Sequence, residues 1–318
     1  MWVYVARRLL LAVPIALGVT VICFGLVFLA PGDPLASLIP GDVSPADLAK
    51  MRQLYGFDKP IPVQYALWLG RAVTGDLGVS LQTGRPVLAE VTGAIGNTFV
   101  IASGAVLLAF SLAFILGTVA AYHVGRPADR LATAAAVLGV SIPNYWLGIV
   151  LIIVFAVKLN ILPATGMGSK GSTSFNILDW AQAKYAVLPI ITMAMVPLGI
   201  IMRTTRSAVA EVLNQDFVQM LRAKGLGPVA ILRHSVRNAL PQMLAVMGLQ
   251  LGYLVGGSIL IETVFTWPGT GFLLNKAILT RDIPVIQGTI LVLALNFVAI
   301  NLAVDLIQTA VDPRIKRT

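Results

Sequence analysis

Six stretches of the chain contain no Asp, Glu, Lys or Arg. Each could cross a membrane, since about 20 helical residues span a hydrocarbon core of about 30 Å, and lipid favours helices because they bond their own backbone groups. The chain is 57% hydrophobic and 12% charged, whereas soluble domains carry roughly 25% charged residues. We predict an all-α polytopic membrane protein with six transmembrane helices, at residues 9–30, 97–122, 131–157, 185–202, 239–261 and 283–304.

Lys and Arg are distributed unevenly between these stretches. With the N-terminus inside, short cytoplasmic segments hold 13 of the 23 Lys and Arg, six of them between Arg203 and Arg237. The other ten are spread over longer external loops, together with nine of the 14 acidic residues. Because cytoplasmic loops carry an excess of Lys and Arg, we predict that both termini are cytoplasmic. The net charge of +9 then reflects topology, and we expect no nucleic-acid partner.

Residues 31–96 predict a small ordered external region between the first two transmembrane helices. The motif that begins at Ser44 has a capping Ser followed by Pro and an acid, which favours a helix start. A second helix is expected around residues 62–73. It would carry a stripe suited either to the membrane interface or to packing on the transmembrane helices, and we favour packing; the stripe is Tyr65, Trp68, Leu69 and Ala72.

A polar cytoplasmic segment, residues 211–242, separates the fourth and fifth stretches. Phe217, Met220 and Leu221 recur at helical spacing beside charged residues, which predicts a short amphipathic helix. Gly225 is placed to end it in a left-handed conformation, and Pro228 to start a second helix that ends near residue 239, before Pro241 opens the fifth span. This segment could dock a partner or lie as a connector on lipid headgroups, and periodicity alone leaves both open.

No motif in the chain supplies energy for transport. There is no Gly-Lys dipeptide, so the phosphate-binding loop G-x-x-x-x-G-K-[ST] is absent. Asp305, one turn after Asn301, is the only acid close to the hydrocarbon core, whereas ion-coupled pumps usually bury several ionisable groups. An ion-coupled secondary transporter that uses Asp305 is the alternative function. An intramembrane enzyme would need a metal cluster or paired acids, and a channel would need rings of charge.

Three further features lie in the predicted spans. Asn144 follows Pro143 in the third span, where a kink is favoured over contact with a substrate. Glu262 lies at the external end of the fifth span, where it either lines the mouth of a pathway or is an interfacial carboxylate. Asn144 and Glu262 are therefore the candidate pathway residues. A ridge of glycines on the fifth span predicts close helix packing rather than pore lining; it consists of Gly248, Gly252 and Gly256.

Short motifs rich in Pro, Gly and charge occur along essentially the whole chain. They include Ala30-Pro31-Gly32-Asp33-Pro34, Gly75-Asp76-Leu77-Gly78, Ser141-Ile142-Pro143-Asn144-Tyr145, Arg222-Ala223-Lys224-Gly225-Leu226, Arg237-Asn238-Ala239-Leu240-Pro241 and Thr266-Trp267-Pro268-Gly269. Together these motifs resemble the inner-membrane permeases of binding-protein-dependent ABC importers, in the branch for dipeptides, oligopeptides and nickel. One departure is that the general family has Glu-Ala-Ala where this chain has Gln219-Met220-Leu221.

The resemblance implies the architecture of a type I ABC importer permease and a non-catalytic role. The chain would form half of the translocation pathway of an ATP-driven importer for short peptides or a related small solute, in a bacterial or archaeal inner membrane. Implied partners are a second homologous permease, two ABC ATPase subunits, a periplasmic or lipid-anchored substrate-binding protein and membrane lipids. The ATPases would bind ATP and Mg²⁺, and this chain no cofactor. The cargo stays open among dipeptides, oligopeptides, nickel, glutathione and opines.

The resemblance also implies that the helix before Gly225 is a coupling helix that sits in a groove of a partner ATPase. Its apolar face would fill the groove, with charged residues at the rim. The implied contact residues are Asp216, Phe217, Gln219, Met220, Leu221, Arg222, Ala223, Lys224, Gly225 and Leu226. The chain then divides into a tip with the first helix (1–30), the external region (31–96), a membrane core (97–310) that contains the coupling loop (203–238), and a cytoplasmic tail (311–318).

Overall fold

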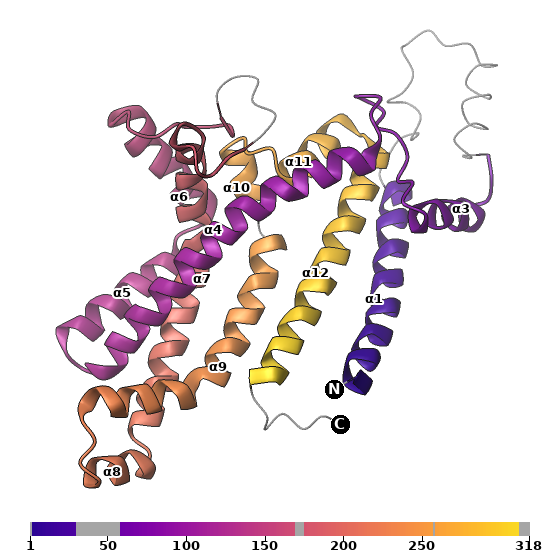
Figure 1. The fold of residues 1–318 in the computed structure, drawn as a ribbon. Coiled ribbons are helices and arrows are strands. Elements are labelled where there is room, and N and C mark those ends of the chain that lie inside the picture. The colour runs from indigo at the N-terminus through magenta and orange to yellow at the C-terminus, as the bar shows by residue number, and fades with distance from the viewer. Residues whose placement is uncertain (1, 30–57, 169–174, 257, 312–318) are drawn as a thin grey trace. The chain divides into compact units, whose positions relative to one another are not determined.

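The computed structural model of the chain describes residues 2–29, 58–168, 175–256 and 258–311 (Figure 1). Within these ranges the chain is helical, and the β pairing is limited to an isolated bridge between Val79 and Pro86. The helix expected from Ser44 lies outside the described residues. The elements are α1 (Trp2–Leu29), α3 (Ile61–Val73), α4 (Val87–Tyr122), α5 (Pro127–Ser141), α6 (Asn144–Leu151), a π-helical segment (Ile152–Lys158), α7 (Trp180–Leu213), α8 (Asp216–Ala223), α9 (Pro228–Gly256), α10 (Ser258–Val264), α11 (Thr270–Thr280) and α12 (Ile283–Val311).

Three helices, α4, α7 and α12, are each long and apolar enough to cross a membrane. The count reaches five if the bent pair of α5 with the segment Asn144–Lys158, and the pair of α9 with α10, are each one span. In α1 the apolar part among the described residues is the shorter stretch Val13–Gly25. An all-helical membrane fold is therefore confirmed. The described residues contain at most five helices or bent pairs that are long and apolar enough to span a membrane, so the predicted six spans are not confirmed.

The third predicted span is two helices that meet at an angle of 101°, not one helix with a simple kink. α5 ends at Ser141, and Ile142 is extended, with φ −85° and ψ 125°. The physical reason is Pro143, whose ring disfavours a helical conformation at the preceding residue and which has no N–H to continue the helix. Asn144 then begins a new helix.

The predicted fifth span and the helix predicted before it form one continuous helix. α9 runs from Pro228 to Gly256 and contains Pro241 within it. The prediction that a helix ends near residue 239 and a new one opens at Pro241 is therefore wrong. Proline removes one backbone hydrogen bond and often kinks a helix, but packing of the flanking turns can keep the helix continuous.

The described residues form two compact units. Unit 1 contains Met1–Asn97 and Pro268–Val298, and unit 2 contains Thr98–Trp267 and Ala299–Thr318. In unit 1, the stripe of the predicted external helix packs inward: Trp68 is buried with Phe24, and Tyr65, Leu69 and Ala72 contact the same cluster. The Tyr65 hydroxyl also lies 2.8 Å from Thr20 Oγ1 of α1. The packing interpretation of this stripe is confirmed.

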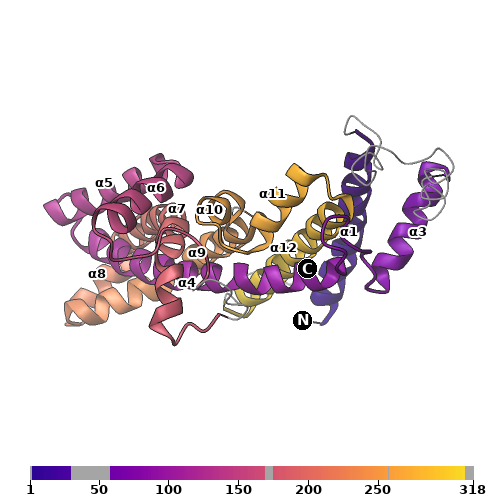
Figure 2. The same ribbon diagram turned by 90° about the horizontal axis from the view of Figure 1, so that it is seen from above.

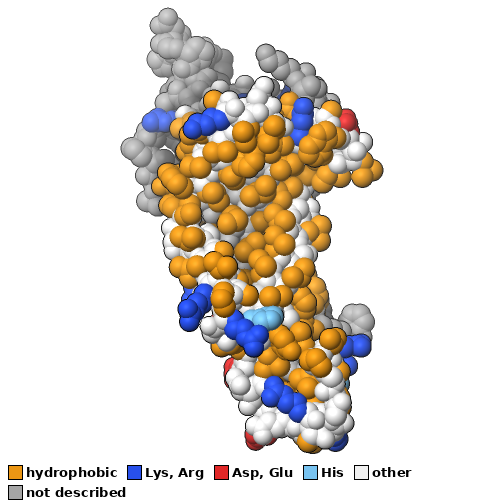
Figure 3. Space-filling view, turned by 90° about the vertical axis from the view of Figure 1, so that its left-hand side faces the viewer, with side chains coloured by type: hydrophobic (Ala, Val, Ile, Leu, Met, Phe, Trp, Pro, Cys, Tyr) orange, Lys and Arg blue, Asp and Glu red, His pale blue; other side chains and the backbone are white. Residues whose placement is uncertain are grey.

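In unit 2, α7 packs against α5, α6, α9 and α10, and α5, α6 and α7 lie together in both ribbon views (Figure 2). Hydrophobic side chains cover most of the face in Figure 3, while Lys and Arg gather toward its ends. Leu131 and Leu249, for example, are 72% and 69% exposed. Such an apolar surface suits lipid rather than water.

Alanine substitutions at a tightly packed glycine and at an open glycine should have opposite effects on stability. Gly199 is the tightly packed one, where α7 crosses α5, and Gly96 is the open one. A Cβ atom at Gly199 would lie 2.5 Å from the Ala136 carbonyl oxygen, whereas one at Gly96 of α4 would meet nothing within 4 Å. Gly199→Ala should therefore destabilise the protein by about 1–3 kcal/mol through overpacking. Gly96→Ala should stabilise it by about 0.5–1 kcal/mol, because alanine loses less backbone entropy in a helix. Melting temperatures of the two purified variants in one detergent check this, and a Gly199→Ala protein that melts no earlier than the wild type would contradict it.

Candidate functional site

The predicted amphipathic helix exists as α8, Asp216–Ala223. It ends as predicted, because Gly225 has φ +78°. The Gly225 N–H donates to the Arg222 carbonyl at 2.9 Å, and the Leu226 N–H donates to the Leu221 carbonyl at 3.2 Å. This pair of bonds is the Schellman arrangement, which satisfies the last carbonyls of a helix and needs a left-handed residue at the turn.

One side of α8 packs against its own chain. Val218 is fully buried, and Phe217 contacts a cluster formed by Ala121, Val209, Ala239, Met243 and neighbouring residues of α4, α7 and α9. Phe217 was expected to face a partner, and the structure instead turns it toward unit 2. Periodicity shows which residues share a helix face but not which surface that face meets.

The other side of α8 is exposed. Met220 is 50% exposed, and the charged side chains of Asp216, Arg222 and Lys224 are exposed around it. Gln219 and Ala223 are also exposed, whereas Leu221 and Leu226 are half-buried. This outer face of α8 combines an apolar centre with charges at the edge, which is the composition of a surface that binds another protein.

The first turns of α9 connect α8 to the membrane part of unit 2. One face is buried at every fourth residue, at Ile231, Ser235, Ala239 and Met243, and it packs on α7. The opposite face exposes Arg233, His234, Arg237 and Asn238. This part of α9 therefore has a buried side that packs on α7 and an exposed, mainly basic side.

An ion pair that the sequence did not predict joins α5 to α7. Asp129 is 4% exposed, and its two carboxylate oxygens accept hydrogen bonds from Nε and Nη2 of Arg206, the latter at 2.8 Å. The Gly125 N–H donates to the same carboxylate at 2.9 Å, and the Thr133 hydroxyl at 3.3 Å. Bidentate Arg–carboxylate pairs of this kind combine strength with a fixed geometry. Asp129 stands as a single acid between Arg126 and Arg130, which was the available signal, but nothing local pointed to Arg206.

The candidate pathway residues lie inside unit 2. Glu262 is 0% exposed, and one carboxylate oxygen accepts a hydrogen bond from the Thr98 hydroxyl at 2.8 Å. Asn144 is half-buried, and its Oδ1 atom is buried without a hydrogen-bond partner among the described residues. Asp305 of the alternative function is half-buried. Within the described ranges, no group of three or more His, Cys, Asp or Glu side chains could hold a metal ion.

The three glycines of the predicted ridge differ in their surroundings. At Gly248 a Cβ atom would lie 2.1 Å from Val304 Cγ1 of α12, so the two helices approach as closely as glycine allows. Gly252 is buried. At Gly256 a Cβ atom would meet nothing within 4 Å. Of these glycines, Gly248 therefore makes a close helix contact, whereas Gly256 faces open space.

The helical fold and the apolar surface define the class of polytopic helical membrane proteins. The profile of the family "Binding-protein-dependent transport system inner membrane component" matches residues 113–317, and that of its N-terminal region matches residues 1–102. The chain belongs to this family. Members are non-catalytic transport components, so the chain is not an enzyme.

Characterised relatives match over nearly their full length. The dipeptide transport system permease protein DppB of Alkalihalophilus pseudofirmus is 38% identical, covering 99% of this chain and 100% of the relative. The oligopeptide transport system permease protein AppB of Bacillus subtilis is 35% identical (98% and 99%), and the glutathione transport system permease protein GsiC of Escherichia coli is 38% identical (98% and 98%).

A solved structure supports the fold. A chain of the MetNI methionine ABC transporter, in an inward-facing conformation, aligns with a TM-score of 0.51 at 20% identity, covering 71% of this chain and 96% of that chain. This likeness bears on the fold alone.

The Asp129–Arg206 pair predicts strong energetic coupling between α5 and α7. Asp129→Ala and Arg206→Ala should each destabilise the protein, because each leaves the partner charge unpaired in a mostly buried setting. The double variant should lose about 1–3 kcal/mol less than the sum of the two single losses. Unfolding of all four proteins in one detergent gives the cycle. Arg203→Ala is the control, since Arg203 is an exposed cation on the same helix; losses that simply add would show that the pair does not hold the helices together.

Proposed function

We propose that this chain is a transmembrane permease subunit of an ATP-driven importer and forms half of the pathway for a short peptide or a related small solute. Family membership and relatives named for dipeptide, oligopeptide and glutathione transport support this. An external binding protein would deliver the solute. The partners would be a second homologous permease and two ABC ATPases, which bind the ATP and Mg²⁺.

The observation that carries the proposal is the two-sided character of α8. Its inner side is fixed by Val218 and Phe217, while its outer side exposes Met220 within a ring of charge. A helix that is fixed on one side and bare on the other can receive a force from a partner and pass it to its own chain. We infer that α8 is the coupling helix that sits in a groove of an ATPase.

Rigid connections lead from α8 into the membrane part of unit 2. α9 is continuous from Pro228 to Gly256, so movement at its cytoplasmic end reaches the middle of the span without a hinge. α7 packs along α9, and the Asp129–Arg206 pair joins α7 to α5. Closure of two ATPases on ATP would therefore move these helices together and switch access from one side of the membrane to the other.

We further propose six spans with both termini in the cytoplasm of a bacterium or archaeon. The span that completes the six would be α1, the first in chain order. It is 28 residues long and therefore about 42 Å in length at 1.5 Å per residue. The distribution of Lys and Arg supports this orientation, and it places the outer face of α8 on the side where ATP is available.

Two substitutions at one glycine test the coupling role of α8. Gly225→Pro should abolish ATP-dependent uptake, because proline fixes φ near about −65° and has no N–H, whereas this turn needs φ +78° and the bond to Arg222. Gly225→Asn should retain most uptake, since asparagine tolerates the left-handed region. The measurement is uptake of a labelled dipeptide by proteoliposomes that contain the complete importer, with the amount of inserted permease and co-purified ATPase as controls. Full uptake by a normally inserted Gly225→Pro importer would refute the coupling role.

The alternative, ion-coupled transport through Asp305, makes a separate prediction. On our proposal, Asp305→Asn leaves ATP-dependent uptake within about twofold of wild type, because no step of it uses this carboxylate. Vesicles that contain this chain alone should take up no dipeptide under a proton or sodium gradient. Gradient-driven uptake by the chain alone, lost in Asp305→Asn, would favour the alternative.

A further inference from the structure

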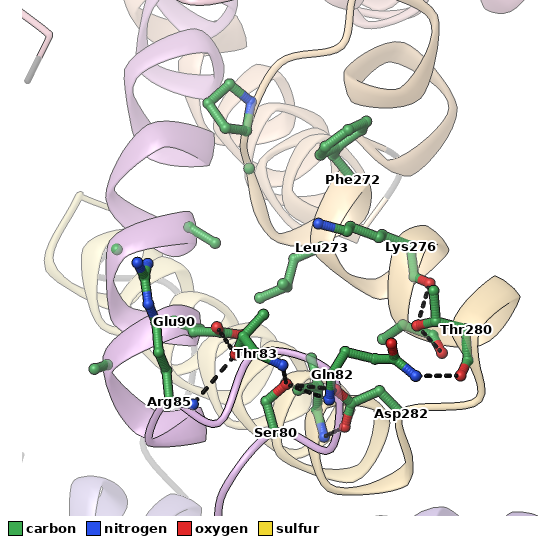
Figure 4. A pocket seen from close by; sticks show the side chains of 17 residues that line it. Ser80, Gln82, Thr83, Arg85, Glu90, Phe272, Leu273, Lys276, Thr280 and Asp282 are labelled. Carbon is green, nitrogen blue, oxygen red and sulfur yellow. Dashed lines mark hydrogen bonds between the residues drawn. The ribbon is translucent and has the colours of Figure 1, made fainter. Parts of the chain in front are cut away.

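Unit 1 contains a cavity of about 410 Å³ between the start of α4, the loop before it and α11 (Figure 4). Cavities that bind small molecules generally measure about 300–1,000 Å³. Its walls combine polar and apolar groups. The lining includes Ser80, Gln82, Thr83, Glu90, Phe272, Leu273, Lys276 and Asp282.

The loop wall of this cavity is held in place by one carboxylate. Asp282 is 3% exposed and accepts hydrogen bonds from the Ser80 hydroxyl at 2.5 Å and from the N–H groups of Leu81 and Gln82 at 3.2 and 3.3 Å. The Ser80 N–H donates to the Arg85 carbonyl at 2.9 Å, which closes the loop on itself. The loop is thus preorganised, and Asp282 is fully engaged in holding it.

Besides Asp282, three charged side chains line the cavity: Arg85, Glu90 and Lys276. Glu90 belongs to α4, and its Oε1 accepts a hydrogen bond from the Thr83 hydroxyl at 2.6 Å. That bond fixes the carboxylate and leaves Oε2 available. Lys276 extends from α11 into the space opposite Glu90 (Figure 4). Arg85, which is exposed, also lines the cavity. No hydrogen bond or ion pair engages the Lys276 ammonium within the described part of the chain.

The apolar part of the wall lies between these charges. Phe272 and Leu273 precede Lys276 on α11 and line the same cavity, and both are only half-buried. A ligand that fits this arrangement carries a cation at one end, an anion at the other and an apolar group between them.

We propose that this cavity binds a short zwitterionic peptide. The peptide's ammonium group pairs with Glu90, its carboxylate pairs with Lys276, and a side chain packs on Phe272 and Leu273. The inference rests on the proposed function for its choice of peptide, and it adds a solute site within the permease itself. Charges of both signs on facing walls favour one small ligand over a protein surface, which would have to insert two opposite charges into this volume.

Matched ligands and variants test the site in the complete importer, in nanodiscs and without the binding protein. The probes are glycyl-phenylalanine, its N-acetyl form and its C-terminal amide, with affinities from saturation-transfer NMR titrations. The wild type should bind each blocked form about tenfold more weakly than the free dipeptide, because each loses a charge-assisted hydrogen bond. Lys276→Gln should weaken the free dipeptide by the same factor without further weakening the amide. Glu90→Gln should behave in the same way toward the N-acetyl form.

Arg281→Gln is the matched control, because it removes a cation directly after α11 that does not line the cavity. The affinities of this variant should equal those of the wild type.

Equal binding of the free dipeptide by wild type, Lys276→Gln and Glu90→Gln would overturn the proposal. In a separate measurement, the binding protein is added and its concentration for half-maximal ATPase stimulation is determined. If Lys276→Gln and Glu90→Gln raise this concentration but leave peptide binding unchanged, the proposal is overturned and the cavity is assigned to docking of that protein. A wild-type importer that binds peptide here but shows no ATP-driven uptake would contradict the proposed function and leave the site intact.

Discussion

Packing of α7 against four other helices is the contact on which unit 2 depends. Lipid is as apolar as the side chains themselves, so helices in a membrane associate through close packing and polar contacts rather than by leaving water. α7 supplies both, with Gly199 where it crosses α5 and with Arg206 paired to Asp129. Two residues separate its end at Leu213 from α8, whose Phe217 packs on the helices beneath. Because an eight-residue helix is marginal alone in water, α8 depends on this packing for its stability.

The part of unit 1 around Asp282 depends on a different interaction. Asp282 lies just before α12, and its carboxylate holds a loop some 200 residues earlier in the chain. The bonds from Ser80 and Gln82 convert a loop of turn-forming residues into a fixed wall, beside which Glu90 and Lys276 face each other (Figure 4). The polar groups of this region are thus divided between those that hold the loop and those that remain available to a ligand.

The apolar stretches, the amphipathic pattern around Met220 and the left-handed turn at Gly225 could be predicted from the sequence, because each follows from local spacing or from the conformational freedom of one residue. The motifs shared along the chain also predicted its family. The predictions were wrong at two prolines. A kink was favoured at Pro143, which instead separates two helices at 101°, and a helix boundary was expected near Pro241, which lies within a continuous helix. The difference between the two prolines depends on how the flanking turns pack.

What the sequence determined by itself was therefore the chain's class: helical, apolar on the outside, and without the phosphate-binding loop G-x-x-x-x-G-K-[ST]. Only the tertiary structure decided which side of α8 is bare, that Asp129 pairs with Arg206, and that Glu90 and Lys276 face one cavity. Each of these depends on contacts between residues distant in the chain, and such contacts are set by the packing of whole helices rather than by any local pattern.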